Sequence, residues 1–268
     1  METAETTQGP FPICDILGMS VACIDRVGVL DHLFGSLARG AGGWLVTANL
    51  DFLRRHAHDP EAAKLYARAD VCVADGMPLV WAARLQGDRL PERVAGSDLL
   101  LLVSERAERE QRSIYLLGGE PTANARAVDW LRGRFPALRI AGNSSPRVSN
   151  PPTPAELAAM REELVRGKPD IVLVGMGSPK QELIIDGLRD ALPGAWWIGV
   201  GISFSFVAGS VRRAPMWMRK IGLEWFYRFL QEPRRLARRY FLEDFPFFFE
   251  LVARSLLARA RPRRAALK

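Results

Sequence analysis

The sequence predicts an α/β protein, with a parallel sheet covered by helices on both faces and a helical segment after it. Short apolar runs alternate with stretches of helical periodicity from about Trp44 to Ser203. These runs lack the polar alternation of a half-exposed strand, which is typical of parallel strands buried on both faces. The last sixty residues are basic and aromatic instead. We therefore expect an α/β body at 1–208 and a helical appendage at 209–268.

Five apolar runs are predicted strands, and helical stretches separate them. The predicted strands are Trp44–Thr47, Val71–Val73, Ser113–Leu117, Asp170–Val174 and Trp196–Val200. The predicted helices of the body are Asp51–Arg55, Pro78–Leu85, Leu99–Glu110 and Ala123–Arg134. Ser97 or Asp98 is a suitable cap for the third of these helices. Asn143–Pro154 is rich in Ser, Pro and Asn, which predicts a surface loop.

The appendage combines positive charge with aromatic side chains. It holds fifteen Lys or Arg against five Asp or Glu, and eleven aromatic residues. Leu223–Leu230 and Arg234–Arg239 are predicted amphipathic helices, and Pro233 suits the start of the second. Arginines suit lipid phosphates and aromatic rings suit the headgroup boundary, so a membrane surface is one interpretation. A helical hairpin with solvated arginines and a nucleic-acid-binding segment are alternatives, although bulky apolar residues favour the membrane over nucleic acid.

Several observations bear on the compartment. Met1–Glu5 is acidic and lacks an apolar run, so we expect no signal peptide. No stretch reaches the roughly 18 apolar residues of a membrane-spanning helix. Three cysteines without CxxC spacing fit a reducing compartment. We expect a cytoplasmic protein that lies peripherally on the inner face of the cell membrane.

Polar and glycine residues follow each predicted strand. They are Thr47 and Asn49, Asp75-Gly76, Gly118-Gly119, Gly175–Glu182 and Gly201–Ser203. In an open parallel sheet, ligands bind outside the carboxyl ends of the strands. These residues should therefore line one edge of the sheet.

Each candidate also has an ordinary structural interpretation. Asp75 could accept a proton from an attacking hydroxyl, but Asp-Gly is common in turns. Thr47 could be a helix cap. The glycine pairs Gly118-Gly119 and Gly175-Met-Gly177 suit a phosphate at a helix N-terminus, or are only tight turns. Arg93 could reach a phosphate or belong to a solvated loop.

The histidines give no metal constellation. His56 and His58 are two positions apart and would diverge on a helix. No pair of aspartates ends a strand, so a metal bridging a diphosphate has no obvious ligands. We expect no metal and no cofactor.

Taken together, these motifs resemble the WecG/TagA/CpsF glycosyltransferase family. The resemblance runs from about residue 14 to about residue 245. The blocks that carry it are Thr47-Ala-Asn49, Ala74-Asp75-Gly76-Met-Pro-Leu-Val-Trp-Ala-Ala-Arg84, Glu92-Arg93-Val-Ala-Gly96-Ser-Asp98, Gly175-Met-Gly-Ser-Pro179-Lys-Gln181-Glu182, and Arg213-Ala-Pro215, Gly222-Leu-Glu224-Trp225-Phe-Tyr-Arg228 and Glu232-Pro233-Arg-Arg235. The resemblance implies a Rossmann-like body, an appendage that targets the membrane, and inverting, metal-independent transfer of a sugar from a UDP-sugar to a polyprenyl-diphosphate-linked saccharide. Exopolysaccharide and other cell-envelope pathways use this step.

The resemblance also implies roles for single residues. Asp75 matches the general base for the acceptor hydroxyl, and Thr47 matches a threonine that positions the reacting groups. The remaining substrate-binding candidates are Asn49, Arg93, Gly118, Gly119, Gly177, Gln181, Glu182, Arg228, Arg235 and Arg238. The three appendage arginines would neutralise the donor diphosphate where a metal is absent. Homo-oligomers that compete with docking of the appendage are a further implication.

One position departs from the family. Many members have Gly-x-x-Phe-Asp-Phe after the last strand, where this chain has Gly201-Ile-Ser-Phe204-Ser205-Phe206. The donor could therefore be of the N-acetylmannosamine type or of the glucose type. Two other classes remain open from the residues: a nucleotide-binding oxidoreductase, which lacks the GxGxxG fingerprint, and a basic nucleic-acid-binding module.

Overall fold

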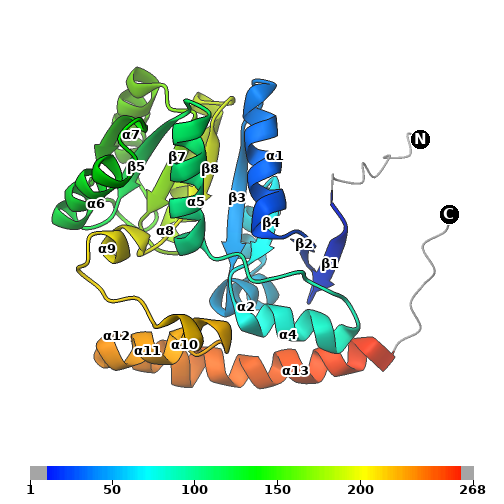
Figure 1. The fold of residues 1–268 in the computed structure, drawn as a ribbon. Helices are drawn as coiled ribbons and strands as arrows, with labels where there is room; N and C mark the ends of the chain where they lie inside the picture. The colour runs from blue at the N-terminus through cyan, green and yellow to red at the C-terminus, as the bar shows by residue number, and fades with distance from the viewer. Residues whose placement is uncertain (1–10, 261–268) are drawn as a thin grey trace.

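A six-stranded parallel sheet forms the centre of the molecule, in the order β4-β3-β8-β7-β5-β6 (Figure 1). The computed structural model describes residues 11–260, without the side chains of Lys220, Arg235 and Ala260. The acidic start of the chain and residues 261–268 of the predicted appendage lie outside this range. The strands are β3 (Gly43–Ala48), β4 (Val71–Ala74), β5 (Ser113–Gly118), β6 (Arg139–Ser144), β7 (Ile171–Gly175) and β8 (Trp196–Gly199). The α/β prediction and the five predicted strands are confirmed.

Helices cover both faces of this sheet. One face packs against α1 (Arg26–Ala38), α5 (Gly96–Arg109) and α6 (Pro121–Arg134). The other packs against α2 (Leu50–His58), α3 (Pro60–Tyr66), α4 (Met77–Gln86), α7 (Pro154–Gly167) and α8 (Lys180–Leu188), which continues into the short η1 (Arg189–Ala191). Successive strand residues alternate between the two cores: Leu45 belongs to the first and Val46 to the second. Both are apolar because both faces are buried, and this produces the unbroken apolar runs.

Three strands have no counterpart in the sequence prediction. A hairpin of β1 (Ile13–Ile16) and β2 (Met19–Ala22) stands beside the main sheet. Strand β6 takes the first two residues of the predicted loop Asn143–Pro154, so that prediction was wrong there. Gly142 and Asn143 are poor strand formers. The extended conformation of β6 is stabilised by its hydrogen bonds to β5 rather than by the strand propensity of its own residues.

The start of α5 also differs from the prediction. Its N-cap is Ala95, with no side-chain capping bond, rather than Ser97 or Asp98. At this earlier start the backbone N–H of Gly96 donates to Asp75 Oδ2 at 3.4 Å. A carboxylate that follows β4 therefore accepts from one of the free backbone donors at the start of this helix.

The C-terminal helices lie across the carboxyl ends of the strands (Figure 1). After α9 (Ser203–Val207) come α10 (Met216–Lys220), α11 (Glu224–Gln231), α12 (Pro233–Ala237), the π-helical η2 (Arg238–Asp244) and α13 (Phe245–Ala260). The two predicted appendage helices correspond to α11 and α12, and Pro233 is the first residue of α12 as expected. The predicted boundary at residue 208 falls in the connection between α9 and α10, and the division into 1–208 and 209–268 stays a prediction.

Helix α13 was not predicted, and it anchors the appendage to the body. Figure 1 shows it beside α4. Its Phe247 and Leu251 are buried in the core formed with α2, α3 and α4. Between residues 11 and 260, no helix combines the length and apolar character needed to cross a membrane.

Candidate active site

A cleft of about 830 Å³ lies between the carboxyl edge of the sheet and the appendage. Body and appendage both contribute to its walls. Nine of the predicted site residues line it: Thr47, Asn49, Asp75, Arg93, Gly118, Gly119, Gly177, Gln181 and Arg228. The sheet edge predicted from the strand ends is therefore the floor of one continuous cleft.

Thr47 lies at the crevice between β3 and β8. After β3 the chain continues into α2, whose buried side chains belong to the core on one face of the sheet. After β8 it continues into α9, whose Phe204 belongs to the core on the other face. Such a reversal opens a crevice at the carboxyl ends of the strands. Thr47 is buried there, and its hydroxyl donates to the carbonyl of Gly199 at 3.3 Å.

Asn49 and Asp75 end neighbouring strands. The Asn49 side-chain oxygen caps α2 by accepting from the backbone N–H groups of Asp51 and Phe52, at 3.1 and 3.3 Å. The Asp75 backbone N–H donates to the carbonyl of Ala48 at 2.7 Å. This bond extends the pairing of β3 and β4 by one residue. Asp75 is therefore held at the carboxyl edge of the sheet, just before α4 begins.

The Asp75 carboxyl is poised to exchange a proton near neutral pH. Its surface is partly accessible from the cleft, while surrounding protein atoms remove it from bulk water. Burial raises the pKa of Asp75 from 3.8 to about 7. Arg93 and the Gly96 N–H act in the opposite direction, and the negative charges of Glu224 and Asp98 add to the rise. A carboxylate of this basicity is suited to general-base catalysis.

Arg93 lines the cleft within a group of five ion-paired side chains, the fifth of which is Arg219, 3.5 Å from Asp98. Its Nη1 lies 2.7 Å from Glu224 Oε2, and its Nη2 lies 3.7 Å from Asp98 Oδ2. Arg213 contacts the same two acids, at 2.7 Å to Asp98 and 3.2 Å to Glu224. Arg93 and Asp98 belong to the body, whereas Glu224 and Arg213 come from the appendage side. The group therefore joins the two parts of the chain at the mouth of the cleft.

The predicted glycines line the cleft at turns that require glycine. Gly118, Gly119 and Gly177 have φ angles of 92°, 78° and 70°, in the region that other residues rarely adopt. A Cβ on Gly119 would lie 3.0 Å from the Phe204 ring. The tight-turn interpretation is thus correct for these positions, and contact with a phosphate stays a prediction.

Gln181 and Glu182 differ in their position relative to the cleft: Gln181 lines it and Glu182 does not. Gln181 Oε1 accepts from the backbone N–H of Gly201 at 3.1 Å, which ties α8 to the turn after β8. Glu182 is buried, outside the cleft lining, and burial raises its pKa. Its expected role in substrate binding has no direct geometric support.

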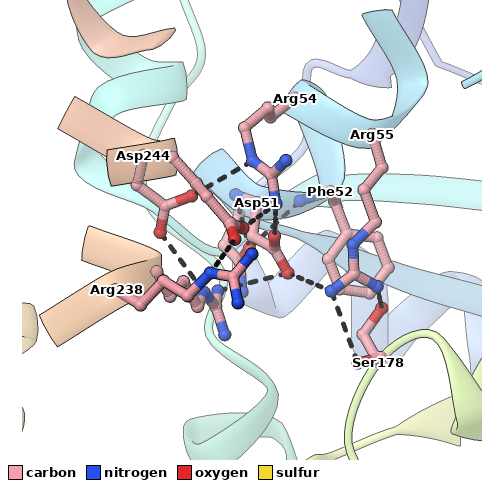
Figure 2. A network of polar contacts seen from close by, with 10 residues as sticks. Asp51, Phe52, Arg54, Arg55, Ser178, Arg238 and Asp244 are labelled. Atoms are coloured by element: carbon pink, nitrogen blue, oxygen red, sulfur yellow. Dashed lines mark hydrogen bonds and ion pairs between the residues drawn. The ribbon is translucent and has the colours of Figure 1, made fainter. Parts of the chain in front are cut away.

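A second polar network joins α2 to η2 (Figure 2). Asp51, only 2 % exposed at its side chain, accepts from Arg54 and Arg55 at 2.7 Å each and pairs with Arg239 at 3.3 Å. Asp244 contacts Arg54 and Arg239, at 3.5 and 3.3 Å. Arg55 also donates to the Ser178 hydroxyl at 3.1 Å, in the turn that lines the cleft. The network thus links the appendage, α2 and the turn after β7.

The appendage arginines divide between the cleft and the surface. Arg228 lines the cleft as predicted. Arg238 is 84 % exposed and lies 3.9 Å from Glu243, outside the lining. The side chain of Arg235 lies outside the described residues. Arg239 and Arg212 line the cleft although they were not singled out from the sequence.

Metal ligands are not grouped in the part of the chain that the structure describes. Within residues 11–260 no cluster of three or more His, Cys, Asp or Glu side chains could hold a metal ion. His58 instead faces the Phe247 ring and Glu250 of α13. Metal-independent chemistry stays a prediction.

The fold and the cleft define an α/β enzyme whose site lies at the carboxyl edge of a parallel sheet. A model of the family described as "Glycosyl transferase WecG/TagA/CpsF family" matches residues 14–262. The chain therefore belongs to this family and is a glycosyltransferase. It is 29 % identical over 226 residues, 84 % of each chain, to N-acetylglucosaminyldiphosphoundecaprenol N-acetyl-beta-D-mannosaminyltransferase of Bacillus spizizenii (strain W23). Neither comparison supports an oxidoreductase or a nucleic-acid-binding module.

Proposed function

We propose that this enzyme transfers a sugar from a UDP-sugar to a hydroxyl of a polyprenyl-diphosphate-linked saccharide, with inversion at the anomeric carbon. The observation that carries this proposal is Asp75, a carboxyl with a pKa of about 7 at the carboxyl edge of the sheet. It shares one cleft with Thr47 and Asn49. The cleft is large enough for a nucleotide-sugar, since ligand pockets commonly measure about 300–1,000 Å³.

The proposed reaction is a single displacement. The acceptor oxygen attacks the anomeric carbon while the bond from that carbon to the UDP oxygen breaks. Asp75 takes the hydroxyl proton, and UDP leaves with the bonding electron pair. Thr47, beside the base, would position the reacting groups. Negative charge grows on UDP in this step, and guanidinium groups stabilise phosphate charge by paired hydrogen bonds.

Three arginines of the cleft wall are suited to that task. They are Arg212, Arg228 and Arg239. All come from the segment after β8, so the donor diphosphate would lie on the appendage side, and the acceptor hydroxyl would lie near Asp75. The glycine turns at Gly118-Gly119 and Gly177 would present backbone N–H groups to the same ligand.

The relative's name supports the acceptor class. That protein is named for an N-acetylglucosaminyl-diphospho-undecaprenol and for N-acetylmannosamine. We infer that this chain uses a polyprenyl-diphosphate-linked saccharide in cell-envelope or exopolysaccharide assembly. Ser205 lines the cleft at the position where many family members carry Asp, so the donor is of the N-acetylmannosamine type or of the glucose type.

A lipid-linked acceptor requires the enzyme to reach the membrane. The appendage exposes apolar side chains, which include Trp217, Ile221, Phe226, Leu230, Leu242, Phe249 and Leu257. Together with the excess of arginine, these side chains suit the interface of an anionic bilayer. We propose peripheral attachment to the inner face of the membrane, where the nucleotide donor is also available.

A donor panel tests the proposed function. The full-length enzyme is incubated with UDP-N-acetylmannosamine, UDP-glucose and other UDP-sugars, together with a polyprenyl-diphosphate-linked saccharide, and UDP release is followed with and without a chelator. We expect release with one donor, unaffected by the chelator and lost in Asp75→Asn. Full activity of Asp75→Asn would refute the assignment of the base, and no UDP from any pair would refute the reaction.

A further inference from the structure

We propose that Glu224 is a positioning residue for the transfer reaction: it holds the Arg93 guanidinium in an ion pair at the cleft wall and thereby keeps this cation from pairing with the Asp75 carboxylate. The inference rests on the proposed role of Asp75 as general base. It gives the docked appendage a task beyond binding, because Glu224 belongs to the appendage and Asp75 to the body.

The geometry of Arg93 is the first observation. Its shorter contact is to Glu224, at 2.7 Å, and its longer one is to Asp98, at 3.7 Å. Among the described side chains these two acids, and not Asp75, are its ion-pair partners within 4.0 Å. Asp75 lines the same cleft and is close enough for Arg93 to lower its pKa. Arg93 thus lies near the proposed base, but its ion pairs are with Glu224 and Asp98.

The placement of Glu224 is the second observation. The side chains of Arg93 and Glu224 are only 15 % and 21 % exposed. Glu224 opens α11, where a carboxylate is favoured by the helix dipole. Gly222, two residues earlier, packs directly on α4: with φ at +80°, a Cβ there would lie 2.9 Å from Met77 Cβ. This contact requires glycine and fixes α11 against the helix that follows Asp75.

The charges around Asp75 come from both parts of the chain. Arg93 and Asp98 face it from the body, and Glu224 faces it from the appendage. Arg213 is ion-paired with both Asp98 and Glu224, and Arg219 is ion-paired with Asp98. Glu224 therefore affects the base in two ways that have the same sign. Its own charge disfavours the carboxylate of Asp75, and its ion pair occupies the cation that would favour it.

The pH dependence of kcat/KM in the full-length enzyme tests this inference. The wild-type profile should lose activity as pH falls through about 7. In Glu224→Gln we expect this acid limb to move to lower pH, by about half a unit or more. A weaker base also lowers the rate on the alkaline plateau, by roughly two- to tenfold. In Arg93→Gln the limb should move to higher pH, because the carboxylate loses a stabilising cation.

Controls separate this effect from damage to the fold. Glu250→Gln removes the same charge from the appendage outside the cleft, and its limb should coincide with that of the wild type. Glu224→Asp keeps the charge, so its acid limb should lie close to that of the wild type. If Glu224→Gln does not fold, Asp98→Asn replaces it and should also move the limb to lower pH, since Asp98 also raises the pKa of Asp75.

The outcomes distinguish this inference from the proposed function. A limb that stays in place in Glu224→Gln, or that moves in the same direction as in Arg93→Gln, overturns the role of Glu224. If Asp75→Asn keeps its activity, or if the wild type has no limb near pH 7, the assignment of the base fails instead. Opposite shifts in the two variants, with Glu250→Gln unchanged, support the proposal.

Discussion

Asp51 of α2 and Arg239 of η2 form an ion pair, with 3.3 Å between Oδ2 and Nη2. The pair joins the start of the second body helix to the π-helical segment η2 of the appendage, and Arg239 lines the cleft. Two further arginines share the same carboxylate (Figure 2). The position of a cleft arginine therefore depends on a buried acid that follows a helix cap.

Replacing Asp51 by Asn should destabilise the protein by about 3 kcal/mol, because a buried carboxylate that three partly buried arginines share is lost. The loss stays at the low end for a buried ion pair, since Arg54 and Arg239 keep their contacts with Asp244. Urea unfolding of the two proteins measures this difference. Glu61→Gln is the matched control, since Glu61 pairs with Lys64 at a site where the side chain is 80 % exposed. We expect about 1 kcal/mol or less for the control. Equal losses in the two variants would contradict the role of Asp51.

The Asp75→Asn variant should lose activity and gain stability. Loss of a general base lowers kcat by roughly 10²–10⁴-fold. The pKa of Asp75 is raised from 3.8 to about 7, so between these values the folded protein binds the proton that the unfolded chain releases. Its contribution to stability therefore falls as pH rises through this range. Thermal unfolding should show Asp75→Asn to be more stable than the wild type at pH 8, with a smaller difference near pH 4.

Gly199→Ala should impair the enzyme through Gln181. A Cβ at this buried position would lie 2.6 Å from Gln181 Nε2, so the side chain that holds the Gly201 backbone must move. We expect a lower kcat/KM in the UDP-release assay. Gly133→Ala is the control, because a Cβ there meets nothing within 4 Å on helix α6. It should keep wild-type activity and gain about 0.4–1 kcal/mol of stability.

If the appendage attaches the enzyme to the membrane, some substitutions in it should weaken vesicle binding without changing the transferase activity. Trp217 and Leu257 are exposed on the appendage and lie outside the cleft lining. Replacing both by Ser should weaken binding to anionic vesicles by about tenfold or more, since each buried side chain of this size contributes roughly 1.5–3 kcal/mol. Activity on a water-soluble acceptor analogue should be unchanged. Val27→Ser, an exposed apolar residue of α1, should leave vesicle binding intact, and equal binding by all three proteins would refute attachment through the appendage.

The sheet and its polar edge could be predicted because their signals are local. Each buried strand is a short apolar run. Thr47 ends one such run, and Asp75 and Gly177 follow two others within three residues. A parallel sheet brings the ends of its strands to one edge whatever the order of the strands. That rule placed seven of the nine candidates in the same cleft without knowledge of which strands are neighbours, and the resemblance added Arg93 and Arg228.

The features that the sequence did not predict depend on contacts between distant segments of the chain. Arg238 and Arg239 are adjacent in sequence, yet one is exposed and the other lines the cleft. The resemblance pointed to Arg238, whereas the packing of η2 against α2, where Arg239 pairs with Asp51, decides which of the two neighbours enters the cleft. Asp51 gives no local signal either, because one of its partners comes from the other end of the chain. The β1–β2 hairpin and β6 are stabilised by hydrogen bonds to a neighbouring strand, and their own composition does not indicate strands.

The cleft has a consequence for the order in which the enzyme becomes competent during its synthesis. Thr47 and Asp75 emerge from the ribosome early, whereas Glu224, Arg228 and Arg239 emerge after the last strand of the sheet. Helix α13, which buries Phe247 and Leu251 against the body, comes later still. A nascent chain thus holds the proposed base long before it holds the cleft wall that is proposed to bind the donor. Ribosome-bound intermediates should be inactive until translation is almost complete, and truncation near the C-terminus should affect chemistry as strongly as a change at the sheet edge.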